Sequence, residues 1–164
     1  MRRRSASALL LSLILAGFTT FANAQSSSAT PVALSAQDYI DIQQLYARYA
    51  LLIDTGDAEG WANTFTADGV FNNSSKGHDA LVQFVHNWRD TRRGASLRHW
   101  NSNLVITPSA NGATGSVYML LLDISIKVPS PTASYRYEDA LVKTAGGWRF
   151  KTRVLHRDTT GPNP

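Results

Sequence analysis

The side chains of this sequence that could do chemistry are imidazoles, carboxylates and phenols. The chain has four histidines and no cysteine, which removes thiol nucleophiles, disulfide exchange and most structural zinc sites. His78 and His86 do not have the spacing of metal ligands on one helical face, and no third partner is evident, so we predict no metal site. The sequence also lacks a phosphate-binding loop, a glycine-rich dinucleotide turn and a serine nucleophile elbow. We therefore expect no cofactor.

Several polar or aromatic residues within apolar stretches are candidate ligand contacts. Asp123 follows an apolar run, where a carboxylate is costly to bury unless it is paired. It could face a pocket or bind a neighbouring tyrosine or arginine. Tyr137 lies in an alternating stretch and is expected to face inward as cavity lining. Tyr46 and Trp88 could also contact a ligand, although their spacing favours a place in the core.

Helical patterns that could position these residues come first along the chain. Ser35 and Asp38 form a capping-box-like start, and apolar residues then recur every three or four positions up to Ile53. We expect this helix to end near residues 54–56. The further helices that we expect are a short one capped by Asp57 and running through Trp61 and Phe65, and one over residues 79–90 that buries Leu81, Phe84, Val85 and Trp88.

Strand patterns follow. The expected strands are a short one at residues 70–71 after an Asp68-Gly69 turn, then residues 97–107, 113–128, 132–143 and 148–158. Helices first and strands last predict an α+β fold, with three N-terminal helices packed on a strongly curved, mostly antiparallel sheet. A long helix across such a sheet gives a cone-shaped barrel that encloses a pocket.

The first 24 residues have the pattern of a signal peptide. Three arginines open the chain, residues 8–18 are almost purely apolar, and Ala22 and Ala24 precede Gln25. This apolar run is too short for a membrane span, which needs about 20 residues. We predict cleavage after Ala24 and a periplasmic or secreted protein, with an uncleaved anchor as the alternative.

The expected organisation of the remaining chain is one domain. Residues 25–34 are rich in serine and are predicted to be a flexible leader. Residues 35–158 are predicted to form the domain and residues 159–164 a C-terminal tail. This length suits one hydrophobic core.

Removing the predicted signal peptide lowers the net charge. The whole chain carries a charge of +4, but three arginines lie before residue 25 and all acidic residues lie after it, which leaves +1. A near-neutral domain has no strong electrostatic reason to bind nucleic acid or an anionic membrane. Arg89, Arg92, Arg93 and Arg98 form a local basic cluster, which we expect to be a solvated face.

Five motifs, in the same order along the chain, resemble SnoaL-like domains of the nuclear transport factor 2-like superfamily. The resemblance is to the branch that contains scytalone dehydratase and hexachlorocyclohexane dehydrochlorinase. The motifs are residues 42–49 with Asp54, Asp57 and Trp61; residues 65–71; Gly77 with Ala80 and Leu81; residues 98–104; and residues 135–139 with 147–150 and Arg153. The superfamily also includes ketosteroid isomerase, polyketide cyclases and non-catalytic proteins, so the resemblance does not determine function.

The resemblance implies a site for proton abstraction. In the dehydratase and the dehydrochlorinase, an aspartate at the end of the first helix pairs with a histidine on the sheet, and Asp54 and His99 stand at those places. His99 would be the general base, Asp54 would orient it, and Tyr49 would donate a hydrogen bond. The dehydratase's second histidine is missing, because Asp123 stands near its place.

Three functions remain open from the sequence. The first is a cofactor-independent lyase, acting by dehydration or elimination, or an isomerase, working on a small and largely apolar molecule. The second is a ligand-binding module without catalysis. The third is an interaction subunit that forms a homo-oligomer, a dimer or trimer, through the exposed face of its sheet.

Overall fold

The computed structural model describes residues 31, 33–92 and 94–158. The predicted signal peptide, most of the predicted leader and the predicted C-terminal tail lie outside these residues. The elements are α1 (Ala36–Thr55), α2 (Ala58–Ala62), β1 (Phe65–Phe71), β2 (Ser75–Lys76), α3 (His78–Thr91), β3 (Leu97–Ser109), β4 (Gly112–Asp123), β5 (Ser130–Thr144) and β6 (Gly147–Arg157).

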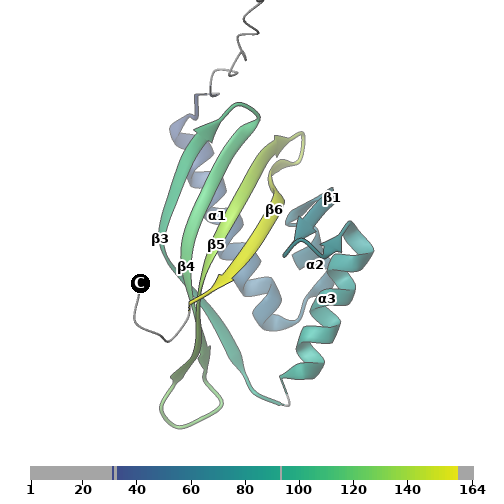
Figure 1. The fold of residues 1–164 in the computed structure, drawn as a ribbon, viewed down its shortest axis with the longest axis vertical. Coiled ribbons are helices and arrows are strands. Elements are labelled where there is room, and N and C mark those ends of the chain that lie inside the picture. The colour runs from purple at the N-terminus through teal and green to yellow at the C-terminus, as the bar shows by residue number, and fades with distance from the viewer. Residues whose placement is uncertain (1–30, 32, 93, 159–164) are drawn as a thin grey trace, which may run out of the picture.

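The strands form one six-stranded sheet in the order β2-β1-β6-β5-β4-β3. Every neighbouring pair is antiparallel except β1 and β6, which run parallel. The sheet is curved but not closed, because β2 and β3 are its two edges. In Figure 1, α1 passes behind β3, β4 and β5, while α2 and α3 lie beside β1. The predicted α+β cone, with helices packed on a mostly antiparallel sheet, is therefore confirmed.

Helix α1 forms where its caps and its apolar stripe predict it. The Ser35 side chain accepts a hydrogen bond from the Asp38 amide, and the Asp38 carboxylate accepts one from the Ser35 amide at 2.9 Å. Gly56 ends the helix in the left-handed conformation, with φ of 79°. The buried stripe faces the sheet and consists of Ile42, Leu45, Tyr46, Tyr49 and Ile53.

The boundary between the second helix and the first strand differs from the sequence expectation. Helix α2 ends at Ala62, and β1 already begins at Phe65. Gly69 lies inside β1, where the register with β6 shifts between Phe65 and Val70. The Asp-Gly pair therefore forms an irregularity within a strand instead of a turn before one. A Cβ at Gly69 would lie 2.7 Å from Phe65 Cβ, so a larger residue does not fit at this position.

Strand β4 is shorter than predicted, because it ends at Asp123 and not at residue 128. The Asp123 carboxylate accepts hydrogen bonds from the amide of Ser125 at 2.8 Å and from its hydroxyl at 2.6 Å. Such a bond two residues along the chain favours a turn over continued strand pairing. The next strand starts at Ser130, which pairs with Asp123.

Strand β3 contains a bulge that separates its two halves. Asn103 has φ of 58°, and the register with β4 shifts between Ser102 and Val105. Before the bulge His99 faces α1, and after it Leu104 packs against the core. The bulge absorbs one extra residue, so both halves of β3 can direct side chains to the concave face of the sheet.

The core beneath α1 and α2 is rich in aromatic rings. Trp61 is fully buried and lies 5.0 Å from Phe65 and 5.5 Å from Phe71, measured between ring centroids. Phe150 of β6 packs 5.4 Å from Phe65. Such pairs add specific edge and face contacts to the burial of apolar area. In the part of the chain that the structure describes, no helix is long and apolar enough to cross a membrane.

Candidate functional site

His99 and Asp54 meet at the junction of α1 and β3. His99 Nδ1 lies 2.6 Å from Asp54 Oδ1, and the two side chains are only 5% and 6% exposed. Asp54 also accepts the backbone N–H of His99, at 3.1 and 3.2 Å. An ionised carboxylate can only accept hydrogen bonds, so in a neutral imidazole the ring proton lies on Nδ1 and the lone pair on Nε2. The structure thus brings together the pair that the family resemblance implied, while its catalytic role remains a prediction.

A cavity of about 240 Å³ lies inside the cone, and we call it the inner cavity. Its walls come from α1, α3 and the concave side of the sheet. They consist of Tyr49, Ile53, Phe71, Asn72, Phe84, Trp88, His99, Met119, Leu121, Tyr135, Tyr137 and Leu155. Mostly apolar walls with a few polar groups are typical of small-molecule sites. The volume limits the enclosed part of a ligand to a small group.

Trp88 forms the wall of the inner cavity next to the imidazole. Its ring centroid lies 5.3 Å from that of His99, and the guanidinium of Arg92 lies 4.2 Å from the same indole ring. Phe84 and Trp88 are half-buried, and they border the inner cavity while also packing against the core. His99 is therefore held between a carboxylate and an indole.

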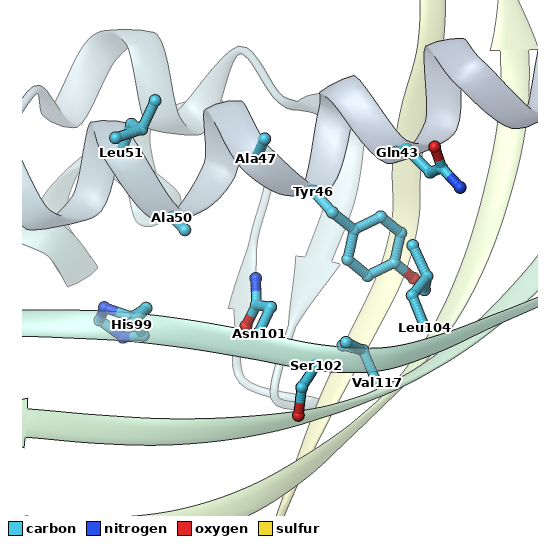
Figure 2. Close-up of a pocket in the computed structure, with 10 residues that line it drawn as sticks. All are labelled: Gln43, Tyr46, Ala47, Ala50, Leu51, His99, Asn101, Ser102, Leu104 and Val117. Atoms are coloured by element: carbon cyan, nitrogen blue, oxygen red, sulfur yellow. The ribbon is translucent and has the colours of Figure 1, made fainter. Parts of the chain in front are cut away.

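A second hollow of about 430 Å³, the outer groove, lies between α1 and β3. Figure 2 shows it, with Asn101 pointing from β3 toward the helix and Tyr46 pointing from α1 toward the strands. Ala47 and Ala50 leave room on the helix side because their side chains are small. His99 borders both hollows, which makes its imidazole the shared wall between them.

Tyr49 and Tyr137 are fully buried phenols at the inner cavity. Their ring centroids are 6.0 Å apart. Burial raises the pKa of Tyr49 and of Tyr137, although the charge of Arg153 acts in the opposite direction. Both phenols therefore keep their protons at neutral pH. The Tyr49 hydroxyl is buried and makes no hydrogen bond of ordinary geometry to the described residues.

Tyr46 borders the outer groove and not the inner cavity. Its hydroxyl donates a hydrogen bond to Asp139 Oδ2. Burial, together with the charge of Asp139, raises the pKa of Tyr46 well above its ordinary value. This phenol is already committed to an internal partner.

Asp123 is not brought to either hollow. It lies at the end of β4, where its bonds to Ser125 hold the pKa of the carboxyl below its usual range. It does not belong to the residues that line the inner cavity or the outer groove. The interpretation of Asp123 as a pocket residue or as a partner of tyrosine or arginine finds no contact to support it.

Arg153 and Asp139 form a buried ion pair that the sequence pattern did not predict. Arg153 Nε lies 2.7 Å from Asp139 Oδ1, and Nη2 lies 2.8 Å from Oδ2, with both side chains fully buried. Burial alone would lower the pKa of Arg153, but Asp139 raises it above its ordinary value. The available signal was that Asp139 shares a strand face with Tyr137, two residues away.

The basic cluster lies on the other side of Asp54. Arg89, Arg92 and Arg98 border an open depression that also contains Asp54 and Ser96. Partial burial lowers the pKa of Arg92, and the charges of Arg89 and Arg98 act in the same direction. Arg93 lies outside the described residues. Within them, no group of three or more His, Asp or Glu side chains is arranged to hold a metal ion.

The fold and this His–Asp pair define a class of protein: an α+β cone with a buried His–Asp pair on the wall of its cavity. The chain belongs to the SnoaL-like domain family, whose pattern matches residues 35–154. This family membership confirms the resemblance to SnoaL-like proteins of the nuclear transport factor 2-like superfamily. No curated protein matches the sequence.

Solved structures of related proteins have the same fold. The Mycobacterium tuberculosis protein Rv3472, of unknown function, is 31% identical over 78% of this chain and 76% of its own, with a TM-score of 0.68. Aln2 from a Streptomyces species is 25% identical over 77% of this chain and 95% of its own, with a TM-score of 0.70. A Catenulispora acidiphila protein in complex with S-DNPA is 28% identical over 76% of this chain and 96% of its own, with a TM-score of 0.68.

Proposed function

We propose that this protein binds a small, largely apolar molecule in the inner cavity and removes a proton from it with His99. One observation carries the proposal: the 2.6 Å contact between His99 Nδ1 and Asp54 Oδ1 lies on the wall of a cavity of about 240 Å³. A histidine paired in this way with a buried carboxylate is suited to act as a general base.

The proposed mechanism uses only side chains of this chain. His99 Nε2 accepts a proton from a C–H group of the ligand, and Asp54 stabilises the imidazolium that forms. Tyr49 donates a hydrogen bond to the ligand oxygen that gains charge. Loss of a leaving group then gives elimination or dehydration, whereas return of the proton to another carbon gives isomerisation. The reaction class is that of a cofactor-independent lyase or isomerase.

Two observations support a small-molecule ligand. The chain belongs to the SnoaL-like domain family, and the structure of one similar protein, from Catenulispora acidiphila, contains the bound compound S-DNPA. The inner cavity of this protein is lined mainly by apolar and aromatic side chains, which favour a ligand with an apolar body.

The first experiment identifies the ligand and then tests the base. Mass spectrometry of the purified mature protein should reveal a bound small molecule, which then serves as the candidate substrate. We expect His99→Ala to reduce its turnover by about 100-fold or more while the fold is retained, because general-base catalysis contributes at least that much. His86→Ala, on α3 and outside the site, is the matched control. Full turnover by His99→Ala would reject the assignment of the base.

A ligand-binding module without catalysis is the second candidate, and the size of the inner cavity favours it equally. This alternative predicts a co-purifying molecule that His99→Ala still binds with unchanged affinity and that the wild-type protein does not convert. A time course by mass spectrometry of the incubated ligand separates the two functions.

Export is part of the same proposal. Three features support a cleaved signal peptide: the arginines at the start of the chain, the apolar residues 8–18, and the small residues Ala22 and Ala24 before the predicted cleavage site. Expression of the full chain in a bacterium with two membranes should give a periplasmic protein whose N-terminus is Gln25. An intact N-terminus in the membrane fraction would support the uncleaved anchor instead.

We also propose that the protein forms a homo-oligomer through the outer face of its sheet. Trp100, Tyr118 and Leu120 are 62%, 51% and 40% exposed, and Trp100 lies opposite Leu120 across β3 and β4. A cluster of exposed apolar side chains is a typical interaction surface. Leu120→Lys should turn a dimer or trimer into a monomer in light scattering, whereas Leu51→Lys on α1 should not. A wild-type monomer at high concentration would contradict this proposal.

A further inference from the structure

The open depression beside Asp54 concentrates positive charge at one end of the molecule. Helices α1 and α3 both end near the start of β3 (Figure 1), and these three ends surround a hollow of about 480 Å³, which we call the arginine depression. Its lining consists of Asp54, Arg89, Arg92, Gly94, Ala95, Ser96 and Arg98. Three guanidinium groups and one carboxylate give this lining a net charge of +2, whereas residues 25–164 as a whole are close to neutral.

The acidic side chains of the protein leave this charge largely uncompensated. All 12 Asp and Glu residues lie in the part of the chain that the structure describes, and there neither Arg92 nor Arg98 forms an ion pair with any of them. Arg89 approaches only the carboxylate of the next residue, at 3.7 Å. The oxygens of Asp54 already accept the ring and backbone N–H groups of His99. The guanidinium groups therefore keep N–H donors for another anion.

Two of the three guanidinium groups are held in place. That of Arg92 lies 4.2 Å from the centroid of the Trp88 indole, and Arg98 Nη1 donates a hydrogen bond to the carbonyl of Leu97 at 2.9 Å. Both arginine side chains belong to half-buried residues. A side chain that is already fixed loses less conformational entropy when it binds a ligand, so the depression is partly pre-organised.

The arginines also lie close enough to affect one another. Partial burial lowers the pKa of Arg92, and the charges of Arg89 and Arg98 lower it further, while the charge of Asp54 acts in the opposite direction. Like charges that are fixed around one hollow repel each other, and an anion between them would relieve this repulsion. The geometry therefore favours an anion site over the solvated face that the sequence suggested.

We propose that the arginine depression binds the phosphate group of a phosphate monoester. Such a group carries nearly two negative charges at neutral pH, which matches the net charge of +2, and its oxygens can accept N–H donors from several guanidinium groups at once. Ser96 adds a hydroxyl donor, and a Cβ at Gly94 would meet no atom within 4 Å, so the rim is open there. The depression shares no lining residue with the inner cavity, so the inference does not depend on the proposed function.

Methyl phosphate is the probe, because it has the charge and the oxygens of the proposed ligand and almost no apolar body. Isothermal titration calorimetry at pH 8 and constant ionic strength should show saturable binding of one molecule per chain. Acetate carries a single charge and has fewer acceptor oxygens, so it should bind at least about tenfold more weakly. In nitrogen–proton NMR spectra, the backbone amides of Gly94 and Ser96 should shift with the same saturation curve.

The variants test whether the guanidinium groups hold the phosphate. Arg92→Met and Arg98→Met should each weaken binding of methyl phosphate by about tenfold or more, because a hydrogen bond between charged groups contributes at least that much. Arg149→Met is the matched control, since Arg149 Nη1 also donates to the carbonyl of the preceding residue, at 2.8 Å, but lies outside the depression. It should bind methyl phosphate as the wild type does. Melting temperatures check that each variant is folded.

Vesicles distinguish the two sources of such a group. Phosphatidic acid presents a phosphate monoester on a lipid surface. Binding to phosphatidylcholine vesicles that contain phosphatidic acid, with loss of binding in Arg92→Met, would assign the site to a lipid headgroup. Binding of methyl phosphate without binding to these vesicles would assign it to a soluble compound. Absence of methyl phosphate binding, or equal binding by the wild type, Arg92→Met and Arg98→Met, would overturn the site.

The uncharged probe 4-nitroanisole separates this inference from the proposed function, because an apolar molecule of this kind reports the inner cavity. It should bind equally well when methyl phosphate is saturating, and competition between the two probes would overturn a separate phosphate site. Binding of 4-nitroanisole without binding of methyl phosphate would overturn this inference and leave the ligand-binding proposal intact. Binding of methyl phosphate alone would support the phosphate site and count against a ligand in the inner cavity.

Discussion

Asp54 contacts His99 twice, through the ring nitrogen and through the backbone N–H. Replacement by asparagine changes the first contact in kind, because an amide can donate to Nδ1 and would move the ring proton to Nε2. A protonated Nε2 cannot accept a proton from the ligand. We expect Asp54→Asn to reduce turnover by about 100-fold or more, with a small change in melting temperature.

The readout for this variant does not need a substrate. Nitrogen NMR of the labelled His99 ring should show the proton on Nδ1 in the wild type and on Nε2 in Asp54→Asn. Asp90→Asn on α3 is the control, since Asp90 lies outside the site and its partner is the adjacent Arg89. An unchanged tautomer in Asp54→Asn would show that Asp54 does not orient the ring.

Asp38 is the residue that ties the start of α1 to the sheet. Its carboxylate accepts hydrogen bonds from Lys143 at 2.7 Å and from the indole of Trp148 at 3.0 Å, besides those of the cap at Ser35. The bond from Lys143, followed by those from Ser35, holds the pKa of Asp38 well below its usual range.

A depressed pKa in the folded state means that this stabilisation is present above the unfolded pKa of about 3.9 and is lost as the pH falls below it. We expect Asp38→Asn to be less stable than the wild type at pH 7. The difference should narrow as the pH falls below about 4, which urea unfolding at a series of pH values measures. Asp41→Asn on the same helix is the control. An equal difference at all pH values would show that the Asp38 charge contributes nothing.

At the scale of elements, the packing of α1 on β4 depends on one glycine. A Cβ at Gly115 would lie 2.0 Å from the Tyr46 hydroxyl oxygen, which is fixed by its bond to Asp139. We expect Gly115→Ala to lower the free energy of unfolding by about 1–3 kcal/mol, as overpacking does. Gly146→Ala is the control, because its Cβ would lie 3.3 Å from the flexible end of Arg149 and 3.8 Å from Thr144 Oγ1, without a severe overlap. Denaturant melts compare the two variants, and equal stabilities would mean that α1 can shift without cost.

Local sequence pattern predicted some of the helices and strands and not others. Helix α1 was predictable because its cap, its apolar period and its terminal glycine all lie within one stretch of sequence. The irregularity at Gly69 was not, because an Asp-Gly pair has the same local preference in a turn and in a bulge, and only the pairing with β6 decides between them. The shift of register at Asn103 likewise hides the alternation of β3.

Some residues of the candidate site could likewise be predicted from the sequence, and others could not. The family pattern placed Asp54 and His99, and the structure brings them together. The contact between Arg153 and Asp139 joins two strands through side chains, and no local period in the sequence reports a partner on another strand. Asp123 was placed by the length of an apolar run, whereas its bond to Ser125 ends the strand there.

At the scale of the whole molecule, the hollow interior is a cost in stability that a purely structural protein would avoid. Leu121 borders the inner cavity from β4 and is half-buried. We expect Leu121→Trp to fill part of the cavity, to weaken binding of 4-nitroanisole by about tenfold or more, and to leave the melting temperature unchanged or higher. Calorimetry and fluorescence titration measure both quantities. Undiminished binding by Leu121→Trp would place the ligand outside the inner cavity, and Leu104→Met at the outer groove then tests that second hollow.

An unclosed sheet has another consequence, which concerns its free margin. Strand β3 is 13 residues long and pairs only with β4, so one side of its backbone presents amide and carbonyl groups to the surroundings. A long unpaired edge can recruit the same strand from another chain and start aggregation. The bulge at Asn103 and the missing N–H of Pro108 interrupt this row of groups. Asn103 and Pro108 therefore disfavour pairing of another strand with the edge of β3. Self-association is then favoured at the broad outer face of the sheet instead.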